Sequence, residues 1–331
     1  MNLVLYHGIC TDGFTCALLM HLYFKATGQE YEMLPVNYKE PLPTNLDGKH
    51  IYVVDFCYPK DVLADFAKVA KSVTVLDHHL TAAQEYGGYG EYVSYYGDCP
   101  IDVRIYEEHS GASLVYKYLS EIEISSNPFD FLNIQRLRDL VRAVRDYDLW
   151  FHEFGDTKII HDLLQTIPRT IDAWIAVFLN ESEEDFSKRV EKCRHYYNAY
   201  EALAATIADT HKVIDLCGYR VPIVNSPHVF ADRICEHLYH QDAPFAISFV
   251  VNSKELYCSL RSKREGGVDV SEIAKKFGGG GHATSAAFKI PPYNLPKLLS
   301  GKLTPQPCLA ERIMDRIIAF LEQVRYSCCK K

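Results

Sequence analysis

The stretch Val73-Thr-Val-Leu-Asp77-His78-His79 is an apolar, β-branched run that ends abruptly in one carboxylate and two imidazoles. Such a run is typical of a buried strand in a parallel sheet. Open α/β sheets bind their ligands at the carboxyl ends of such strands, and polar groups buried there need partners such as metal or phosphate. Taken alone, the stretch is also compatible with a strand cap made of hydrogen-bonded histidines.

Three further stretches repeat the pattern and favour a site over a cap. Residues 2–7 form an apolar strand that breaks into His7-Gly-Ile-Cys10-Thr-Asp12-Gly13, and a helix is expected over about 14–26. Residues 51–55 form a strand that ends at Asp55, and a helix is expected over 60–71, opened by a proline. A later helix runs into an acidic aromatic segment with Asp146 and Asp148, where we expect Asp148 to be a solvated turn residue.

The chain is long enough for two domains, since it has 331 residues. Residues 1–186 alternate strands with helices, including one near 111–120, and this predicts βαβ crossovers and a parallel sheet. Gly87–Gly90 is expected to be a loop. A connecting helix is expected over 187–210, within a longer helical stretch that begins near 183. In the second domain, 211–331, we expect strands near 213–216, 221–224, 245–251 and 256–261 and a helix near 308–324.

Composition favours a soluble intracellular enzyme with a small substrate. The net charge is −8 and there is no long Lys/Arg tract, which argues against a grip on long duplex nucleic acid. No apolar run is long enough to span a membrane. The eleven cysteines form no C-x-x-C pair, which is typical of reduced thiols, and no signal peptide is recognised, so we expect a cytoplasmic protein.

A second polar feature lies near the C-terminus, where Phe277 is followed by four glycines, 278–281, and His282. Consecutive glycines cost backbone entropy, so they need a reason. They can let main-chain N–H groups converge on an anion, to which His282 would add a donor. Upstream, Arg261 ends a strand, and its guanidinium is interpreted as a bidentate hydrogen-bond donor to a phosphate or carboxylate.

These motifs resemble, in order, those of the DHH phosphoesterases with a DHHA1 C-terminal domain. The stretch H-G-I-C-T-D-G-F is similar to motif I of a subgroup that includes nanoRNases, V-V-D-F-C-Y-P to motif II, L-D-H-H to motif III and V-R-D-Y-D-L-W to motif IV. The stretch G-G-G-G-H is similar to the DHHA1 signature. The resemblance implies an α/β fold: an N-terminal DHH domain with a parallel sheet covered by helices on both faces, and a smaller C-terminal α/β DHHA1 domain.

The resemblance also implies roles for single residues. Asp55 would bridge two divalent ions, His7 would bind one of them, and the other would be bound by Asp12, His78 and Asp146. His79 would face the phosphate, and Asp77 would orient an imidazole. The substrate-binding residues in the second domain would be Arg261, Ser262, Gly279, Gly280, Gly281 and His282. Oxygen ligands mixed with imidazole suit Mn²⁺ or Mg²⁺, with Co²⁺ as a further possibility.

Cys10 departs from the D-x-D that many family members carry in motif I. It is either a thiolate ligand to the ion beside His7 or a small buried residue next to the site.

Three functions follow as hypotheses. The first is a metal-dependent phosphodiesterase that hydrolyses short oligoribonucleotides or linear dinucleotides to mononucleotides, as nanoRNases do. The second is a small-molecule phosphatase that acts on bisphosphonucleosides such as pAp, or on pyrophosphate or polyphosphate. The third is a non-catalytic nucleic-acid-binding module. The expected partners are a short RNA, dinucleotide or nucleotide and, as a possibility, a second copy in a homodimer; no membrane and no long duplex is expected.

Overall fold

The computed structural model describes residues 1–37, 40–124, 130–239 and 243–305 of the chain. It divides into two compact units, an N-terminal unit of Met1–Asn198 and a C-terminal unit that begins at Ala199. The boundary falls inside one long helix, α8 (Glu183–Ala208), which covers most of the stretch predicted to connect two domains. The helix expected near 308–324 lies outside the described residues.

The N-terminal unit is built on a six-stranded sheet with the order β2-β1-β3-β4-β6-β5. All neighbouring pairs are parallel except β5 and β6. The strands are β1 (Asn2–His7), β2 (Tyr31–Val36), β3 (His50–Val54), β4 (Ser72–Asp77), β5 (Gly90–Tyr96) and β6 (Cys99–Ile105). The three strands that end in the predicted site, β1, β3 and β4, lie side by side, and each agrees with its predicted range to within one residue.

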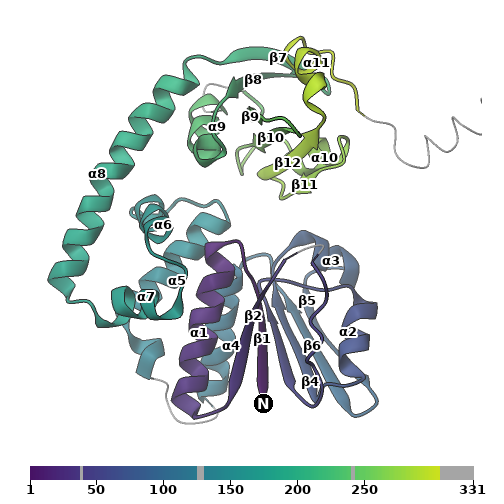
Figure 1. Ribbon diagram of the computed structural model, residues 1–331, viewed down its shortest axis with the longest axis vertical. Coiled ribbons are helices and arrows are strands. Elements are labelled where there is room, and N and C mark those ends of the chain that lie inside the picture. Colours follow the sequence, from purple (N-terminus) through teal and green to yellow (C-terminus); the bar gives the residue numbers. More distant parts are fainter. Residues whose placement is uncertain (38–39, 125–129, 240–242, 306–331) are drawn as a thin grey trace, which may run out of the picture. The chain divides into compact units, whose positions relative to one another are not determined.

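Helices cover both faces of this sheet, as predicted (Figure 1). Because side chains alternate along a strand, Val4 packs into one core and Leu3 and Leu5 into another. The first core includes side chains of α1 (Thr11–Thr27), α4 (Gly111–Ile124), α5 (Gln135–Asp148), α6 (Thr157–Thr166) and α7 (Ile171–Ile175). The second includes side chains of α2 (Lys60–Ala67) and α3 (Leu80–Tyr86). Short helical turns η1 (Asp130–Asn133) and η2 (Ala176–Asn180) complete the unit.

The antiparallel hairpin of β5 and β6 at one edge of the sheet was not predicted from the sequence. Gly87, expected in a loop, ends α3 in the left-handed conformation, and Gly90 already begins β5. The chain reverses at Gly97, whose φ of 58° suits a tight turn, and returns as β6. Residues of β6 alternate between buried and half-buried, so this strand is recognisable by its period of two.

The C-terminal unit is a second α/β layer structure, with a sheet of order β11-β12-β10-β9-β8-β7. Its strands are β7 (Lys212–Leu216), β8 (Tyr219–Asn225), β9 (Ala246–Val251), β10 (Leu256–Arg261), β11 (Gly280–Gly281) and β12 (Ser285–Ile290), and β8 and β9 are its parallel pair. The helices are α9 (Ala231–Tyr239), α10 (Val270–Lys275) and α11 (Leu295–Leu299), with turns η3 (His228–Phe230) and η4 (Pro292–Asn294). The four strands predicted here, near 213–216, 221–224, 245–251 and 256–261, correspond to β7, β8, β9 and β10.

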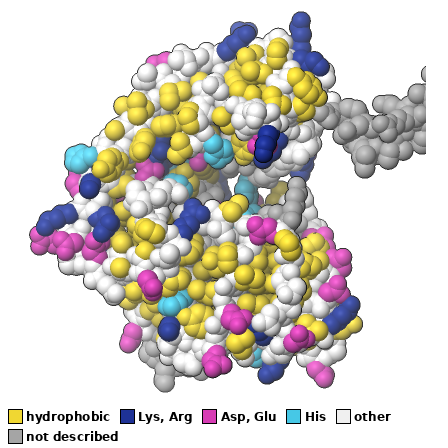
Figure 2. Space-filling model, viewed as in Figure 1, with side chains coloured by type: hydrophobic (Ala, Val, Ile, Leu, Met, Phe, Trp, Pro, Cys, Tyr) yellow, Lys and Arg dark blue, Asp and Glu magenta, His cyan; other side chains and the backbone are white. Residues whose placement is uncertain are grey.

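Within the described ranges, no helix combines the length and the apolar character that crossing a membrane would require. On the face seen in Figure 2, Lys and Arg side chains are dispersed among acidic and apolar ones and do not gather into one basic patch.

Candidate metal centre

The carboxyl ends of three neighbouring parallel strands bring the candidate site together. β1 ends at His7, β3 ends one residue before Asp55, and β4 ends at Asp77, which is followed by His78 and His79. Neighbouring parallel strands end at the same edge of a sheet, so these side chains converge although they are far apart in the sequence.

Asp55 lies at the middle of the cluster and is 1% exposed. Its Oδ1 is 3.1 Å from His78 Nε2. Its Oδ2 accepts a hydrogen bond from Cys10 Sγ at 3.0 Å and lies 3.5 Å from His7 Nδ1. The backbone of Asp55 has a φ of 55°, which a residue with a Cβ adopts only when its surroundings hold it there. The two oxygens of the Asp55 carboxylate therefore face two different groups of side chains that could act as metal ligands, called donor groups below.

In each of the two donor groups, the potential ligand atoms lie within 4.8 Å of one another. One group is His7, Cys10 and Asp55, and the other is Asp12, His78 and Asp148. A third group of this kind, Asp55 with Asp77, His78 and His79, overlaps both. Carboxylate oxygens and imidazole nitrogens of this kind fit hard or borderline divalent cations.

Asp12 is fixed by the start of helix α4. Its carboxylate accepts hydrogen bonds from the N–H groups of Gly111 at 2.6 Å and Ala112 at 2.8 Å, and its Oδ2 lies 3.7 Å from His78 Nε2. Gly111, which the sequence analysis missed, leaves room for the cluster, because a Cβ there would lie 2.5 Å from Asp55 Cβ. The glycine at the first position of a helix, directly after Ser110, was the available signal.

Cys10 combines two tasks at the start of helix α1. Its thiol caps the helix by accepting a hydrogen bond from the Gly13 N–H at 3.1 Å, and it lies 3.3 Å from His7 Nδ1. Burial, together with the charges of Asp55 and Asp12, raises the pKa of the thiol well above its usual value. The thiol thus lies among the potential ligands, and a cation would be needed to make its thiolate form favourable.

Asp77 and His79 form a pair beside the two groups. Asp77 is fully buried, and its Oδ1 lies 2.6 Å from His79 Nδ1 and accepts a hydrogen bond from the His78 N–H at 2.8 Å. This contact fixes the ring of His79 by one nitrogen, in the manner of the carboxylates that orient imidazoles next to metal ions.

The concentration of carboxylates shifts the pKa values of the cluster. Burial alone would lower the pKa of His78, but Asp148, Asp55 and Asp12 outweigh it and raise that pKa to about 10. Burial would raise the pKa of Asp55, but the hydrogen bonds from His7 and His78 hold it well below its usual value. Burial and the charges of Asp55 and Asp148 raise the pKa of Asp12. The crowded carboxylates therefore favour the protonated forms of His78 and Asp12, and a bound cation would compensate the same negative charge.

The structure places Asp148, and not Asp146, among the potential ligand atoms around His78. Asp148 is an exposed residue at the end of α5, as the interpretation as a solvated residue expects, but its Oδ2 also lies 3.5 Å from His78 Nε2. Asp146 is not in either donor group. Its carboxylate accepts hydrogen bonds from the N–H groups of Glu153 at 3.0 Å and Phe154 at 3.2 Å, and from the Thr157 hydroxyl. The geometry therefore favours Asp148 over Asp146 as the fourth-motif ligand.

The glycine run of the C-terminal unit has a structural explanation. Gly278 lies in the turn after α10 with a φ of 78°, and a Cβ on Gly279 would lie 2.1 Å from the Ala287 carbonyl oxygen. The N–H groups of Gly278, Gly279 and His282 donate to carbonyl oxygens of Lys275, Ala274 and Ser285. These three amides do not converge on an anion in this structure, whereas the side chain of His282 is exposed.

Arg261 and Ser262 also have protein partners. Arg261 is 8% exposed and forms an ion pair with Asp232 at 2.6 Å. Ser262 is fully buried, and its hydroxyl donates to the Lys263 carbonyl oxygen at 3.1 Å. In this arrangement, His282 is the most accessible of the predicted substrate-binding side chains.

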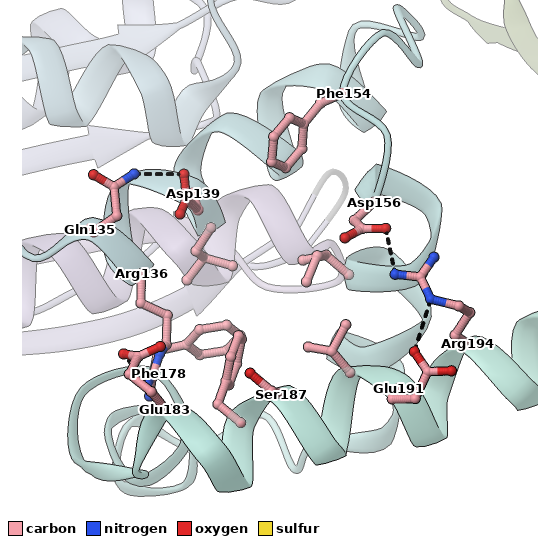
Figure 3. A pocket seen from close by; sticks show the side chains of 14 residues that line it. Gln135, Arg136, Asp139, Phe154, Asp156, Phe178, Glu183, Ser187, Glu191 and Arg194 are labelled. Carbon is pink, nitrogen blue, oxygen red and sulfur yellow. Dashed lines mark hydrogen bonds and ion pairs between the residues drawn. The ribbon is translucent and has the colours of Figure 1, made fainter.

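A cavity of about 590 Å³ in the N-terminal unit lies apart from this chemistry. Figure 3 shows that its walls come from α5, α6, η2 and the first half of α8, with Arg136 and Phe178 on one side and Asp156 and Arg194 on another. None of the residues of the two donor groups lines it.

Residues 229–301 match the model of the DHHA1 domain family. An uncharacterized protein of Acanthamoeba polyphaga mimivirus is 25% identical over 309 residues, which covers 87% of this chain and 67% of that protein.

Two solved structures share the fold. A DHH-domain structure from a member of a ribosomal-protein family has a TM-score of 0.56 at 13% identity, covering 90% of this chain and 84% of its own. RecJ from Thermus thermophilus, in complex with Mn²⁺, has a TM-score of 0.50 at 13% identity, covering 89% of this chain and 50% of its own.

Proposed function

We propose that this chain is a member of the DHH/DHHA1 phosphoesterases and acts as a metal-dependent phosphodiesterase that hydrolyses short oligoribonucleotides or linear dinucleotides to mononucleotides. The observation that carries the proposal is Asp55, whose two carboxylate oxygens face two separate groups of donors. A shared carboxylate between two ligand groups is what a two-metal phosphoester hydrolase needs.

The donor set supports two divalent ions, for which we propose Mn²⁺. His7, Asp55 and Cys10 would hold one ion, and Asp12, His78, Asp148 and the second oxygen of Asp55 would hold the other. Ions held there would act as Lewis acids that stabilise negative charge on a phosphoryl oxygen. The Mn²⁺ bound to RecJ of Thermus thermophilus, a protein of similar fold, supports a divalent ion of this kind.

His79 would supply the protein's own contact with the phosphate. Asp77 holds His79 Nδ1 at 2.6 Å, which directs the other side of the imidazole away from Asp77. Burial lowers the pKa of His79, but the charge of Asp77 outweighs it and raises that pKa, so a proton-bearing imidazole is favoured. Such a donor stabilises the charge that builds on phosphoryl oxygens in the transition state.

A short substrate fits the charge of the protein. The net charge of −8 and the dispersed Lys and Arg side chains in Figure 2 offer little grip on a long polyanion. In the C-terminal unit we propose that His282 contacts the nucleotide and that the backbone of Gly279, Gly280 and Gly281 positions it. We propose that Arg261 and Ser262 contribute indirectly, by stabilising the local structure without contacting the nucleotide. We place the protein in the cytoplasm because its eight described cysteines are free thiols.

The test is hydrolysis by the full chain, with and without Mn²⁺, of dinucleotides, longer RNA, pAp and pyrophosphate. We expect Mn²⁺-dependent cleavage of dinucleotides and short RNA with rates that fall for longer strands. Faster release of phosphate from pAp or pyrophosphate would favour the phosphatase hypothesis. Tight RNA binding without hydrolysis of any substrate would favour the binding module.

A further inference from the structure

We propose that Asp146 is a positioning residue that closes the turn Leu149–Thr157 and thereby holds Asp148 against His78. The inference rests on the proposed function, because it takes Asp148 to be a metal ligand. It concerns a carboxylate that lies two residues from the donor group without being part of it.

The contacts of Asp146 reach far along the chain. Its carboxylate accepts hydrogen bonds from the N–H groups of Glu153 and Phe154 and from the hydroxyl of Thr157. Its backbone carbonyl accepts from the N–H groups of Phe151 at 2.9 Å and His152 at 3.4 Å. Asp146, near the end of α5, is thus hydrogen-bonded to five residues of the segment that leads into α6. Asp146 is 7% exposed, so water does not readily replace partners that are lost.

The turn that Asp146 closes is strained. Trp150 has a φ of 60° and His152 a φ of 53°, a conformation that bulky side chains avoid. Such residues persist only where their surroundings hold them, and they gather at functional sites. Ring contacts also stabilise the turn. The ring centroids of stacked Tyr147 and His161 are 3.6 Å apart, and those of Trp150 and His152 are 4.6 Å apart. Without the hydrogen bonds to Asp146, we expect the turn to relax.

Asp148 depends on this turn for its place. It is the last residue of α5, its side chain is 30% exposed, and its ion pair in the described part of the chain is the one with His78. Asp12, by contrast, is held by two backbone N–H groups of α4. Asp148 is therefore the member of its donor group that would move most easily, and the closed turn determines where α5 ends.

The chain provides a matched set of variants. Asp146→Asn keeps the shape and weakens the acceptor, and Thr157→Val removes one donor to Asp146 while keeping the volume. Thr157→Ser restores that donor. Asp156→Asn is the control, since Asp156 lies in the same turn and its carboxylate pairs with Arg194 at 2.8 Å, outside the donor groups.

The test is calorimetric titration of the metal-free full-length proteins with Mn²⁺, together with circular dichroism in chelator and steady-state kinetics. We expect Asp146→Asn and Thr157→Val to lower the affinity for one of the two ions by about tenfold or more. Thr157→Ser and Asp156→Asn should bind as the wild type does. At saturating Mn²⁺ the KM for a dinucleotide should stay unchanged, because Asp146 does not touch the substrate.

Wild-type affinity for both ions in Thr157→Val and Asp146→Asn would overturn the inference, and so would an equal loss in Asp156→Asn. If Asp146→Asn does not fold in chelator, the comparison of Thr157→Val with Thr157→Ser decides. The readout separates the two proposals. A wild-type protein that binds two Mn²⁺ ions but cleaves no oligonucleotide would contradict the proposed substrate, while the titrations would still decide the role of Asp146.

Discussion

Asp55 Oδ1 lies 3.1 Å from Nε2 of His78, and this contact joins the two residues that directly follow the neighbouring strands β3 and β4. The other oxygen of Asp55 is turned toward Cys10 and His7. No neighbouring carboxylate could take over the role of Asp55 between the two donor groups. Among the described residues, no other acidic residue belongs to the group with His7 and Cys10.

The first prediction is that Asp55→Ala abolishes hydrolysis, with a loss in kcat on the order of 10³-fold or more, because both ions lose a ligand. The measurement is turnover together with metal stoichiometry. Near-normal turnover in this variant would contradict the assignment of two metals.

The second prediction concerns the space behind Asp55. In Gly111→Ala, the new Cβ would lie 2.5 Å from Asp55 Cβ and 2.9 Å from its Cγ, so the carboxylate must shift. We expect Mn²⁺ affinity to fall by about tenfold to 100-fold, as for other residues that position ligands. Gly155→Ala is the matched control, because nothing lies within 4 Å of a Cβ there. Equal Mn²⁺ titrations for the two variants would show that the site tolerates the shift.

The third prediction separates the two tasks of Cys10. Serine keeps a cap for the Gly13 N–H and removes the thiol, whereas alanine removes both. If the thiolate is a ligand, Cys10→Ser should change metal preference without lowering stability, and Cys10→Ala should also lose about 1 kcal/mol of unfolding free energy with the cap. Cys10→Asp should restore the commoner ligand and retain activity. Metal titrations unchanged in both Cys10→Ser and Cys10→Ala would leave Cys10 as a cap alone.

The strand ends were predictable from the sequence because their physics is local. A β-branched run that stops at a carboxylate or imidazole indicates both the strand and the edge at which the side chain lies, and this located His7, Asp55 and Asp77. The hairpin of β5 and β6 was missed because β5 is an exposed edge strand whose residues show little alternation in burial. Its pairing depends on contact with β6, which local sequence does not encode.

The positions of Asp146 and Asp148 also show which part of the site the local sequence encodes. Asp148 lies four residues after Val144 and seven after Val141, so helical periodicity places it on the same side of α5 as these buried residues, although Asp148 itself is exposed at the helix end. That signal was present in the sequence. Asp146 follows the phase of half-buried Asp139 and exposed Arg142, and it is buried because the turn to α6 folds back onto it. The path of such a turn is set by tertiary contacts.

The fourth prediction concerns protons. Burial lowers the pKa of His78, but Asp148, Asp55 and Asp12 raise it to about 10 in the metal-free protein, so the imidazole is protonated at neutral pH. A metal ion binds the neutral ring, and its binding must release that proton. Apparent Mn²⁺ affinity should therefore rise with pH from neutrality toward 10. Calorimetry at neutral pH in buffers of different ionisation enthalpy should detect the released proton, and His78→Gln should release fewer. Identical binding heats in all buffers would contradict the prediction.

The same shift predicts how stability depends on pH in chelator. A raised folded-state pKa contributes stability that is fully present below the ordinary value of 6.5 and is lost as the pH rises through about 10. Wild type should therefore lose more unfolding free energy than His78→Gln between neutral and alkaline pH, measured by denaturant titration.

The last prediction concerns substrate length and the C-terminal unit. His282→Ala should raise the KM for dinucleotides by about tenfold, as expected for one lost charge-assisted hydrogen bond, and leave the melting temperature unchanged because the side chain is exposed. Arg261→Ala should lower the melting temperature, since it leaves Asp232 without the arginine of its ion pair. A generic activated phosphodiester has no second nucleotide to contact His282, so its hydrolysis should be spared by His282→Ala. Rates should fall steeply from dinucleotides to strands of about 24 nucleotides, because an acidic protein gains little from additional phosphates. Equal rates at all lengths, or equal losses on both kinds of substrate in His282→Ala, would show that this residue does not select short RNA.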